Sequence, residues 1–370
     1  MPVGTVHIIG AGLAGLSAAV HLTASGHKVA LYEAGQHAGG RCRSYHDKEL
    51  DCLIDNGNHL MLSCNEAALS YLMMIGAEDT LQIAKGAIFP FMDVQTGQGW
   101  TIRMGQGRFP SWVFDKDARV PDTKWTDYLS ALKITAADRW AHVADVLDKN
   151  SVLYKRFWQP LTVAIMNTQT EEASAQVFGN VLREAFGAGG IGCKPVIVKE
   201  GLSQSFVEPA EVYLKQNGAV LHYGKRLRGI DIEADEIKTL HFVDGDVGLD
   251  QWDWVVLALP AWVVNDLLPT VPTPTQFRSI VNAHFKVAVP PKSETGILGL
   301  IGGAVEWIFE KPNMISTTTS AAEKIVDMSA EEIAALLWCD IAKVYGLNAA
   351  DIPQYRVVKE KRATFAATPE

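Results

Sequence analysis

The stretch that decides the fold is TVHIIGAGLAGLSAAVHLTASGHKVALYEA, residues 5–34. Residues 5–9 form a short run of β-branched and apolar side chains, which predicts a buried parallel strand. Residues 16–24 predict a helix, and residues 27–34 predict a second strand that ends in an acidic residue. The order strand, glycine-rich turn, helix and strand is that of a βαβ unit.

The turn of this unit carries the dinucleotide-binding fingerprint GxGxxG. Gly10 permits the tight turn, Gly12 lets the backbone approach a pyrophosphate, and Gly15 lets the helix pack on the strand. The free N–H groups of the helix N-terminus would bind the phosphates, and Glu33 would accept the ribose hydroxyls. The expected cofactor contacts of this unit also include Ala11, Leu13, Ala14 and Ala34.

A second glycine pair follows at once, in GGRCRS at residues 39–44. Gly39 and Gly40 allow the backbone to turn close to a cofactor, and Arg41 can neutralise phosphate charge with its planar guanidinium. Arg43 more plausibly supports the loop. A solvated basic turn is the alternative reading of this segment.

These motifs, followed by DNGNHL (55–60), resemble the N-terminal part of the flavin amine oxidase-like superfamily, which implies FAD as the cofactor. Further segments resemble the hydroxysqualene dehydroxylase family, squalene-associated FAD-dependent enzymes of bacterial hopanoid biosynthesis. The resemblance extends from residue 3 to the end of the sequence. Besides DNGNHL, it rests on FWQPLTVAIMNT (157–168), EEAS (171–174), VLALPAWVVNDLLP (256–269) and VEWIF (305–309). The narrower signals among these are the WQPL…NT and DNGNH segments.

The resemblance implies reductive removal of the hydroxyl group of hydroxysqualene to give squalene, with reduced FAD as the hydride donor. The implied partner is a hydrophobic C30 isoprenoid, and the donor that reduces FAD stays unidentified. We therefore expect an apolar cavity with one proton donor near the hydroxyl group.

The resemblance also implies further site residues. FAD contacts are expected at Asn56, Gly57, Asn58 and His59, and at Leu227 in the segment that approaches the adenine. His59 and Asp55 are the candidate proton donors, since His titrates near neutrality and a buried carboxyl can hold a proton. Asn167 is a candidate hydrogen-bond partner of the substrate hydroxyl. A purely structural role is the alternative for all three.

The predicted fold class is α/β, an FAD-binding Rossmann-like domain of the GR2 type interleaved with a mixed α+β substrate domain. We assign residues 1–85 and 196–265 to the FAD-binding domain. Residues 86–195 and 266–345 form the substrate-binding domain, and residues 346–370 return toward the FAD domain.

Further elements are predicted inside these domains. The helices are expected at 125–134, 173–186 and 331–346, and the strands at 218–233, 238–246 and 252–260. Within the last strand, VVLALP (255–260) is expected to be fully buried. The resemblance implies a closing Gly-Asp pair and helix after residues 362–370, and the printed sequence ends before one. Gly245-Asp246 is expected in a loop and cannot replace it. A chain without the closing segment should bind FAD more weakly.

Composition narrows the function classes. The net charge of −9 argues against a nucleic-acid partner, and five scattered cysteines without a CxxC pair argue against disulfides and metal. We therefore expect a reducing, cytoplasmic location. The apolar run 296–309 contains Glu306 and is shorter than the ~20 residues of a membrane span. A water-insoluble substrate leaves open peripheral contact with the inner face of the cytoplasmic membrane, near residues 100–125.

Two other functions remain open at this point. An FAD-dependent polyprenoid (carotenoid-type) desaturase or an amine oxidase would share the cofactor site. A desaturase differs only in the direction of electron flow, which no residue pattern reveals. A cofactor-free binding protein is the third reading.

Overall fold

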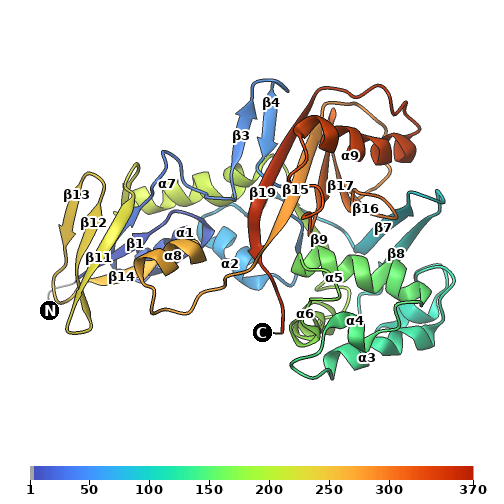
Figure 1. The fold of residues 1–370 in the computed structure, drawn as a ribbon, viewed down its shortest axis with the longest axis horizontal. Helices are drawn as coiled ribbons and strands as arrows, with labels where there is room; N and C mark the ends of the chain where they lie inside the picture. The colour runs from blue at the N-terminus through green and yellow to red at the C-terminus, as the bar shows by residue number, and fades with distance from the viewer. Residues whose placement is uncertain (1–3, 370) are drawn as a thin grey trace.

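The computed structural model describes residues 4–369, which form two sheet-centred regions (Figure 1). The region at the left of Figure 1 is built on a parallel sheet with the strand order β10-β2-β1-β14. Strands β1 (Thr5–Ile9) and β2 (Lys28–Tyr32) are joined by helix α1 (Leu13–Ala24), which confirms the predicted βαβ unit. Strand β10 (Val220–His222) pairs with β2, and β14 (Trp254–Leu257) pairs with β1.

Both faces of this sheet are covered, because successive side chains of a strand point to opposite faces. Ile8 packs against helices on one face, and the next residue, Ile9, packs against strands on the other. The helices are α1, α2 (Glu66–Met74) and α7 (Glu208–Gln216). The other face carries an antiparallel sheet of β11 (Leu227–Glu233), β12 (Glu236–Phe242) and β13 (Gly245–Gly248), together with α8 (Ala261–Leu267).

The prediction of three strands between residues 218 and 260 was wrong in number. The segment forms five strands in two sheets, because the chain turns after His222 and leaves the parallel sheet. Gly245 and Asp246 open β13 instead of lying in the preceding loop. The expectation that residues 255–260 are fully buried was also wrong. Within residues 4–369, β14 is the edge of its sheet, and Val255, Val256 and Leu257 are only partly buried.

The second region is built on a mixed sheet with the strand order β19-β15-β18-β17-β16-β7-β8. Helix α9 (Ala330–Tyr345) covers one face, as the predicted helix at 331–346 implied. Its N-terminus has a capping box between Ser329 and Glu332, which satisfies two backbone donors. The strands are β7 (Ala87–Asp93), β8 (Gly99–Met104), β15 (Phe277–Phe285), β16 (Ile297–Ile301), β17 (Trp307–Lys311), β18 (Met314–Thr319) and β19 (Tyr355–Phe365).

A group of short helices packs beside β7 and β8, at the lower right of Figure 1. Their shared core is aromatic, with Trp112, Tyr128, Phe157 and Trp158 in successive contact. The helices are η2 (Ser111–Phe114), η3 (Trp125–Leu129), α3 (Ser130–Thr135), α4 (Val143–Val146), η4 (Tyr154–Trp158), α5 (Gln159–Met166) and α6 (Ala175–Gly187). The predicted helices at 125–134 and 173–186 fall on η3–α3 and α6.

Short elements complete the connections between the two regions. Strands β3 (Ser44–Asp47) and β4 (Cys52–Asp55) form a hairpin. Strand β19 is the edge of the seven-stranded sheet, and its Arg362 and Ala363 carbonyls reach Arg41 of the N-terminal region. The remaining elements are β5 (Met61–Leu62), β6 (Leu81–Ile83), β9 (Pro195–Val198), η1 (Glu78–Thr80) and η5 (Ser203–Val207).

Candidate functional site

The three glycines of the first turn each meet a different steric demand. Gly10 has φ +104°, a conformation that side chains with a Cβ rarely adopt. A Cβ on Gly15 would lie 1.8 Å from the carbonyl oxygen of Gly10, so the helix could not approach the strand. A Cβ on Gly12, in contrast, would meet no heavy atom of residues 4–369 within 4 Å. The space in front of Gly12 is therefore open, as a site for pyrophosphate requires.

Glu33 is held at the end of β2 by two backbone amides. The Ala11 N–H donates to Oε2 at 2.9 Å, and the Gly35 N–H donates to Oε1 at 2.7 Å. The carboxylate is thereby fixed beside the glycine turn. Its remaining lone pairs can accept hydrogen bonds from a diol such as the ribose of a dinucleotide.

The second glycine pair lies directly against the first turn. The Gly39 N–H donates to the carbonyl oxygen of Ala11 at 2.8 Å, and Gly39 forms a parallel bridge with Gly12. Gly39 and Gly40 both have positive φ, and a Cβ on Gly40 would contact the Gly12 Cα at 3.4 Å. The two glycine segments therefore lie directly against each other, with Gly40 exposed beside Gly12.

Arg41 takes a position that the sequence did not predict. Its Nη1 donates to the carbonyl oxygens of Arg362 and Ala363 at the end of β19. Its Nε and Nη2 make no hydrogen bond within residues 4–369, so these donors remain available to an anion. Arg43 points elsewhere and lines a separate cavity with His37 and Tyr45, which agrees with a supporting role in the loop.

Leu227 lies close to the predicted adenine end of the site. The preceding residues Gly224 and Lys225 donate backbone hydrogen bonds to the carbonyls of Gly35 and Glu33. Leu227 itself is buried at the start of β11. Its contact with adenine stays a prediction.

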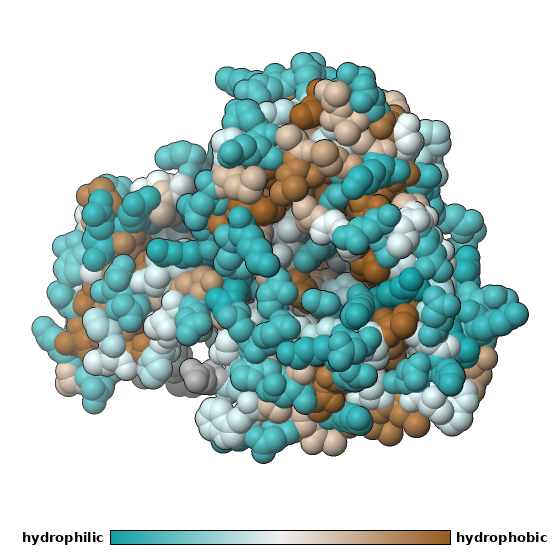
Figure 2. Space-filling model, turned by 45° about the vertical axis from the view of Figure 1, so that its right-hand side comes forward, coloured by the Kyte–Doolittle hydropathy of each residue, from teal (hydrophilic) through white to brown (hydrophobic). Residues whose placement is uncertain are grey.

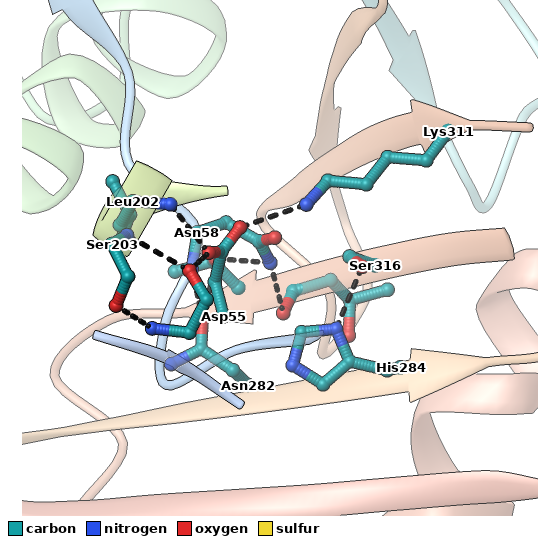
Figure 3. A network of polar contacts seen from close by, with 11 residues as sticks. Asp55, Asn58, Leu202, Ser203, Asn282, His284, Lys311 and Ser316 are labelled. Atoms are coloured by element: carbon teal, nitrogen blue, oxygen red, sulfur yellow. Dashed lines mark hydrogen bonds and ion pairs between the residues drawn. The ribbon is translucent and has the colours of Figure 1, made fainter. Parts of the chain in front are cut away.

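Asp55 is the centre of a buried polar network that joins both regions (Figure 3). Its Oδ1 accepts hydrogen bonds from the Ser44 hydroxyl at 2.7 Å and the Leu202 N–H at 2.8 Å. Its Oδ2 lies 2.8 Å from the Nζ of Lys311 on β17. Both oxygens of the carboxylate are therefore occupied by protein donors, and this geometry supports a positioning role.

The residues after Asp55 are tied to the seven-stranded sheet by a second set of contacts. Asn58 Nδ2 donates to the Thr317 carbonyl and to the Thr318 hydroxyl, and the Thr318 hydroxyl donates to Asn282 Oδ1. A Cβ on Gly57 would lie 3.1 Å from Asn282 Nδ2. The DNGNHL segment is therefore fixed by strands β15 and β18, more than 220 residues later in the sequence.

His284 supports the same network from strand β15, with its Nδ1 2.7 Å from the Ser316 hydroxyl oxygen (Figure 3). Burial, and secondarily the nearby Lys311 cation, lower the pKa of His284 to about 4. The imidazole is therefore neutral at physiological pH, and the Ser316 hydroxyl can donate to it.

His59 has a different environment from Asp55. Its side chain is solvent-accessible, yet the surrounding protein lowers its pKa by desolvation. His59 is therefore mainly neutral at pH 7, and it could donate a proton only through a minor protonated form.

Asn167 is buried at the C-terminus of α5 with φ +47°. Its Oδ1 accepts a hydrogen bond from the Ala321 N–H at 2.6 Å, and its Nδ2 donates to the Thr364 hydroxyl at 3.0 Å. Both ends of the amide are therefore occupied by protein. This favours a structural link between α5, β18 and β19 over a contact with substrate.

Sequence reasoning missed Glu306 as a titratable group. Desolvation raises the pKa of its carboxyl to about 7, although Oε2 accepts a hydrogen bond from the Ser320 N–H at 2.7 Å. Its signal was visible in the sequence, since it is the one acidic residue of the apolar run 296–309. The consecutive amides of Ser320 and Ala321 thus bind Glu306 and Asn167, respectively.

The described residues 4–369 contain neither a candidate metal site nor a candidate membrane span. In residues 4–369, no cluster of three or more His, Cys, Asp or Glu side chains could hold a metal ion. Over the same residues, every helix falls short of the length and apolarity needed to cross a bilayer.

Comparison with known proteins places these features in a family. Residues 13–366 match the family model described as flavin containing amine oxidoreductase. The chain is 43% identical to hydroxysqualene dehydroxylase of Zymomonas mobilis, over 98% of this chain and 87% of that protein. It is also 43% identical to hydroxysqualene dehydroxylase of Sinorhizobium fredii, over 99% and 87%. A zeta-carotene desaturase of Synechocystis is 24% identical over 63% of this chain and 52% of its own length.

Solved structures agree on the fold. An oxidoreductase from Methanosarcina mazei superposes with a TM-score of 0.71 at 15% identity, covering 96% of this chain and 87% of that one. Cyclohexylamine oxidase from Brevibacterium oxydans gives 0.68 at 16% identity, covering 99% and 87%. At these identities the likeness concerns the fold alone.

Proposed function

Because this chain belongs to the flavin-containing amine oxidoreductase family, and within it to the hydroxysqualene dehydroxylases, we propose that it converts hydroxysqualene into squalene with FAD as its cofactor. The observation that carries the proposal is the 43% identity to two hydroxysqualene dehydroxylases over nearly the whole chain. The open space at Gly12, between the two glycine segments and beside Glu33, fits the pyrophosphate and ribose of FAD.

We assign the cofactor contacts as follows. The amides around Gly12 and Gly40 and the free donors of Arg41 would bind the pyrophosphate, and Glu33 would bind the adenosine ribose. The segment from Asn56 to His59, which Asp55 and Asn282 hold in place, would also contact the cofactor. The full set is Gly10, Ala11, Gly12, Leu13, Ala14, Gly15, Glu33, Ala34, Gly39, Gly40, Arg41, Asn56, Gly57, Asn58, His59 and Leu227.

The reaction exchanges a hydroxyl group for hydrogen. The C–O bond breaks, a proton joins the leaving oxygen to form water, and the carbon receives a hydride, which reduced FAD supplies when bound. The chain must therefore hold the isoprenoid, exclude bulk water and deliver one proton. We propose that the isoprenoid binds against the buried aromatic cluster of Tyr128, Phe157 and Trp158.

His59 is our preferred proton donor among the predicted candidates, because its side chain is accessible while Asp55 and Asn167 are occupied by protein partners. A donor with a lowered pKa is protonated in only a small fraction of molecules at pH 7, so turnover should increase toward lower pH. Asp55 then fixes the position of the segment that carries His59.

The substrate and the electron source bear on where in the cell the enzyme acts and on what it needs for turnover. A C30 isoprenoid is almost insoluble in water, so we place the reaction in the cytoplasm at the inner face of the membrane. An electron donor, not identified by the chain, must reduce FAD after each turnover.

The decisive test is product formation by the FAD-loaded protein. Anaerobic incubation of hydroxysqualene with the protein and a flavin reductant should give squalene, detected by mass spectrometry. A desaturase would instead need an electron acceptor and give a more unsaturated product, and that result would overturn the proposal. His59→Ala with unchanged turnover would remove His59 from the mechanism without touching the overall reaction.

A further inference from the structure

An unusual number of apolar side chains is exposed on one segment of the helical region. Phe109, Phe114 and Trp125 are 69%, 53% and 46% exposed, yet they contact one another. The ring centroids of Phe109 and Phe114 are 6.1 Å apart, and those of Phe114 and Trp125 are 5.5 Å apart. Three exposed aromatic rings thus form one cluster on the surface.

The helix that follows continues this cluster. Trp125 and Leu129 lie on the 3-10 helix η3, and Leu132 lies on α3, which follows it directly. All three are exposed, the leucines by 51% and 65%, while Tyr128 and Ile134 of the same helices are buried. The helix is therefore apolar toward solvent as well as toward the core.

We call Phe109, Phe114, Trp125, Leu129 and Leu132 the apolar patch. In Figure 2, where this side of the molecule comes forward, brown side chains interrupt the teal surface over the helical region. Single exposed apolar residues are ordinary, but contiguous patches mark surfaces that bind protein or membrane.

The charges around the patch differ from those of the whole chain. Residues 103–140 contain seven Lys or Arg and five Asp, whereas the whole chain has 33 basic and 42 acidic residues. Arg108, Lys116 and Lys124 are exposed immediately beside the aromatic rings. Of the acidic residues in this range, Asp122 pairs with Arg156, whereas Asp115 and Asp117 are exposed on either side of Lys116.

We propose that the apolar patch docks the protein on a lipid bilayer that contains anionic headgroups. Aromatic rings at the level of the headgroups, apolar side chains below them and basic residues beside them are the composition of an interfacial anchor. The basic residues are attracted by the negative surface of such a bilayer, although the protein as a whole is acidic. The choice of lipid over a protein partner rests on the proposed function, because the substrate dissolves in bilayers.

The patch also lies next to the aromatic core that we assign to the substrate. Trp112 stands on the same turn as Phe114, and it packs edge-on against Tyr128 at 5.2 Å between ring centroids and contacts Phe157. Docking through the patch therefore places the bilayer surface beside this apolar interior. An isoprenoid could pass between the two without crossing water.

Sedimentation with vesicles tests this proposal on the FAD-loaded protein without any substrate. The wild type should sediment with vesicles of phosphatidylcholine and phosphatidylglycerol, and less with phosphatidylcholine alone. The variant Phe109→Ser/Phe114→Ser/Trp125→Ser should bind at least about tenfold more weakly, which corresponds to ~1.4 kcal/mol. The matched control is Ile232→Ser/Val243→Ser/Trp252→Ser, which removes equally exposed apolar residues at the opposite end of Figure 1 and should bind as the wild type.

A second variant keeps the test valid if the triple variant folds poorly. Lys116→Glu/Lys124→Glu leaves the apolar patch in place and should lose the preference for phosphatidylglycerol. A wild type that stays in the supernatant, or a patch variant that sediments normally, would overturn the proposal. So would a dimer that the patch variant converts to monomer, since the patch would then be an interface between copies. Turnover of detergent-dispersed hydroxysqualene tests the proposed function separately, because it needs no bilayer.

Discussion

Lys311 and Asp55 are 256 residues apart in sequence, and the Nζ of one lies 2.8 Å from Oδ2 of the other. The ion pair joins the C-terminal end of β17 to the C-terminal end of β4. The segment that we assign to FAD follows β4 immediately. Asp55 is 3% exposed, so the pair is largely shielded from water on the carboxylate side.

We expect Lys311→Met to destabilise the fold by about 2–4 kcal/mol, because it leaves a buried carboxylate without its counter-charge. Lys286→Met is the matched control. Its Nζ donates to the neutral Leu50 carbonyl at 2.7 Å, so its loss should cost about 1 kcal/mol. Urea unfolding measures both values. Asp55→Asn combined with Lys311→Met should recover part of the loss, and equal costs for the two lysine variants would contradict this account.

Two glycines of the first turn should respond in opposite ways to the same added methyl group. Gly15→Ala should unfold or strongly destabilise the protein, because the new Cβ would lie 1.8 Å from the Gly10 oxygen. Gly12→Ala should change the unfolding free energy by less than about 0.5 kcal/mol, since its φ of −69° suits alanine and its Cβ meets open space. It should nevertheless lower FAD affinity at least about tenfold.

Thermal unfolding and flavin absorbance of the purified variants separate these effects. A Gly12→Ala protein that retains FAD at wild-type affinity would place the pyrophosphate elsewhere. A stable Gly15→Ala protein would show that α1 can move away from β1 at little cost.

The βαβ unit was predictable because all its determinants are contiguous in sequence. Gly10, Gly12, Gly15 and Glu33 act within one turn and one strand end, so spacing alone places them. The contact of Gly39 with Ala11 is also local, since only the short loop after β2 separates it from the fingerprint.

The tertiary partners of the predicted site residues were not predictable. Asp55 and Asn167 were recognised as polar residues in informative segments, but Lys311, Ala321 and Thr364 lie 150 or more residues later. No periodicity connects such positions. From the sequence, a catalytic role was therefore a reasonable hypothesis for both residues. Their hydrogen bonds to protein partners now argue against that role.

Substitutions of Asn167 distinguish a structural link from a substrate contact. Asn167→Ala removes both hydrogen bonds and places alanine at φ +47°, so we expect a loss of about 2–4 kcal/mol in unfolding free energy. Asn167→Asp keeps the acceptor for the Ala321 amide and should lose less. If Asn167 instead binds the substrate hydroxyl, Asn167→Asp will lower kcat/KM with detergent-dispersed substrate while its melting temperature stays normal.

Glu306 should make stability depend on pH in a direction unusual for a carboxylate. Its pKa is raised from 4.5 to about 7 by desolvation, so the folded protein holds this proton more tightly than the unfolded chain does. Below about pH 4.5 both states are protonated, and the group imposes no penalty. Between pH 4.5 and 7 only the unfolded state ionises, so its contribution to stability falls as pH rises and stays low above pH 7.

Glu306→Gln removes this titration but can still accept the Ser320 amide. The variant should match the wild type near pH 4 and exceed its unfolding free energy by on the order of 2 kcal/mol at pH 8. Denaturant unfolding at the two pH values measures the difference. The control is Glu310→Gln on β17, the strand that begins just after Glu306. Glu310 accepts hydrogen bonds from the Tyr345 hydroxyl and from two backbone amides, so this variant should be less stable than the wild type at both pH values. If the difference in unfolding free energy between Glu306→Gln and the wild type is constant across this pH range, Glu306 is ionised throughout. That result would require a counter-charge that the known contacts of Glu306 do not include.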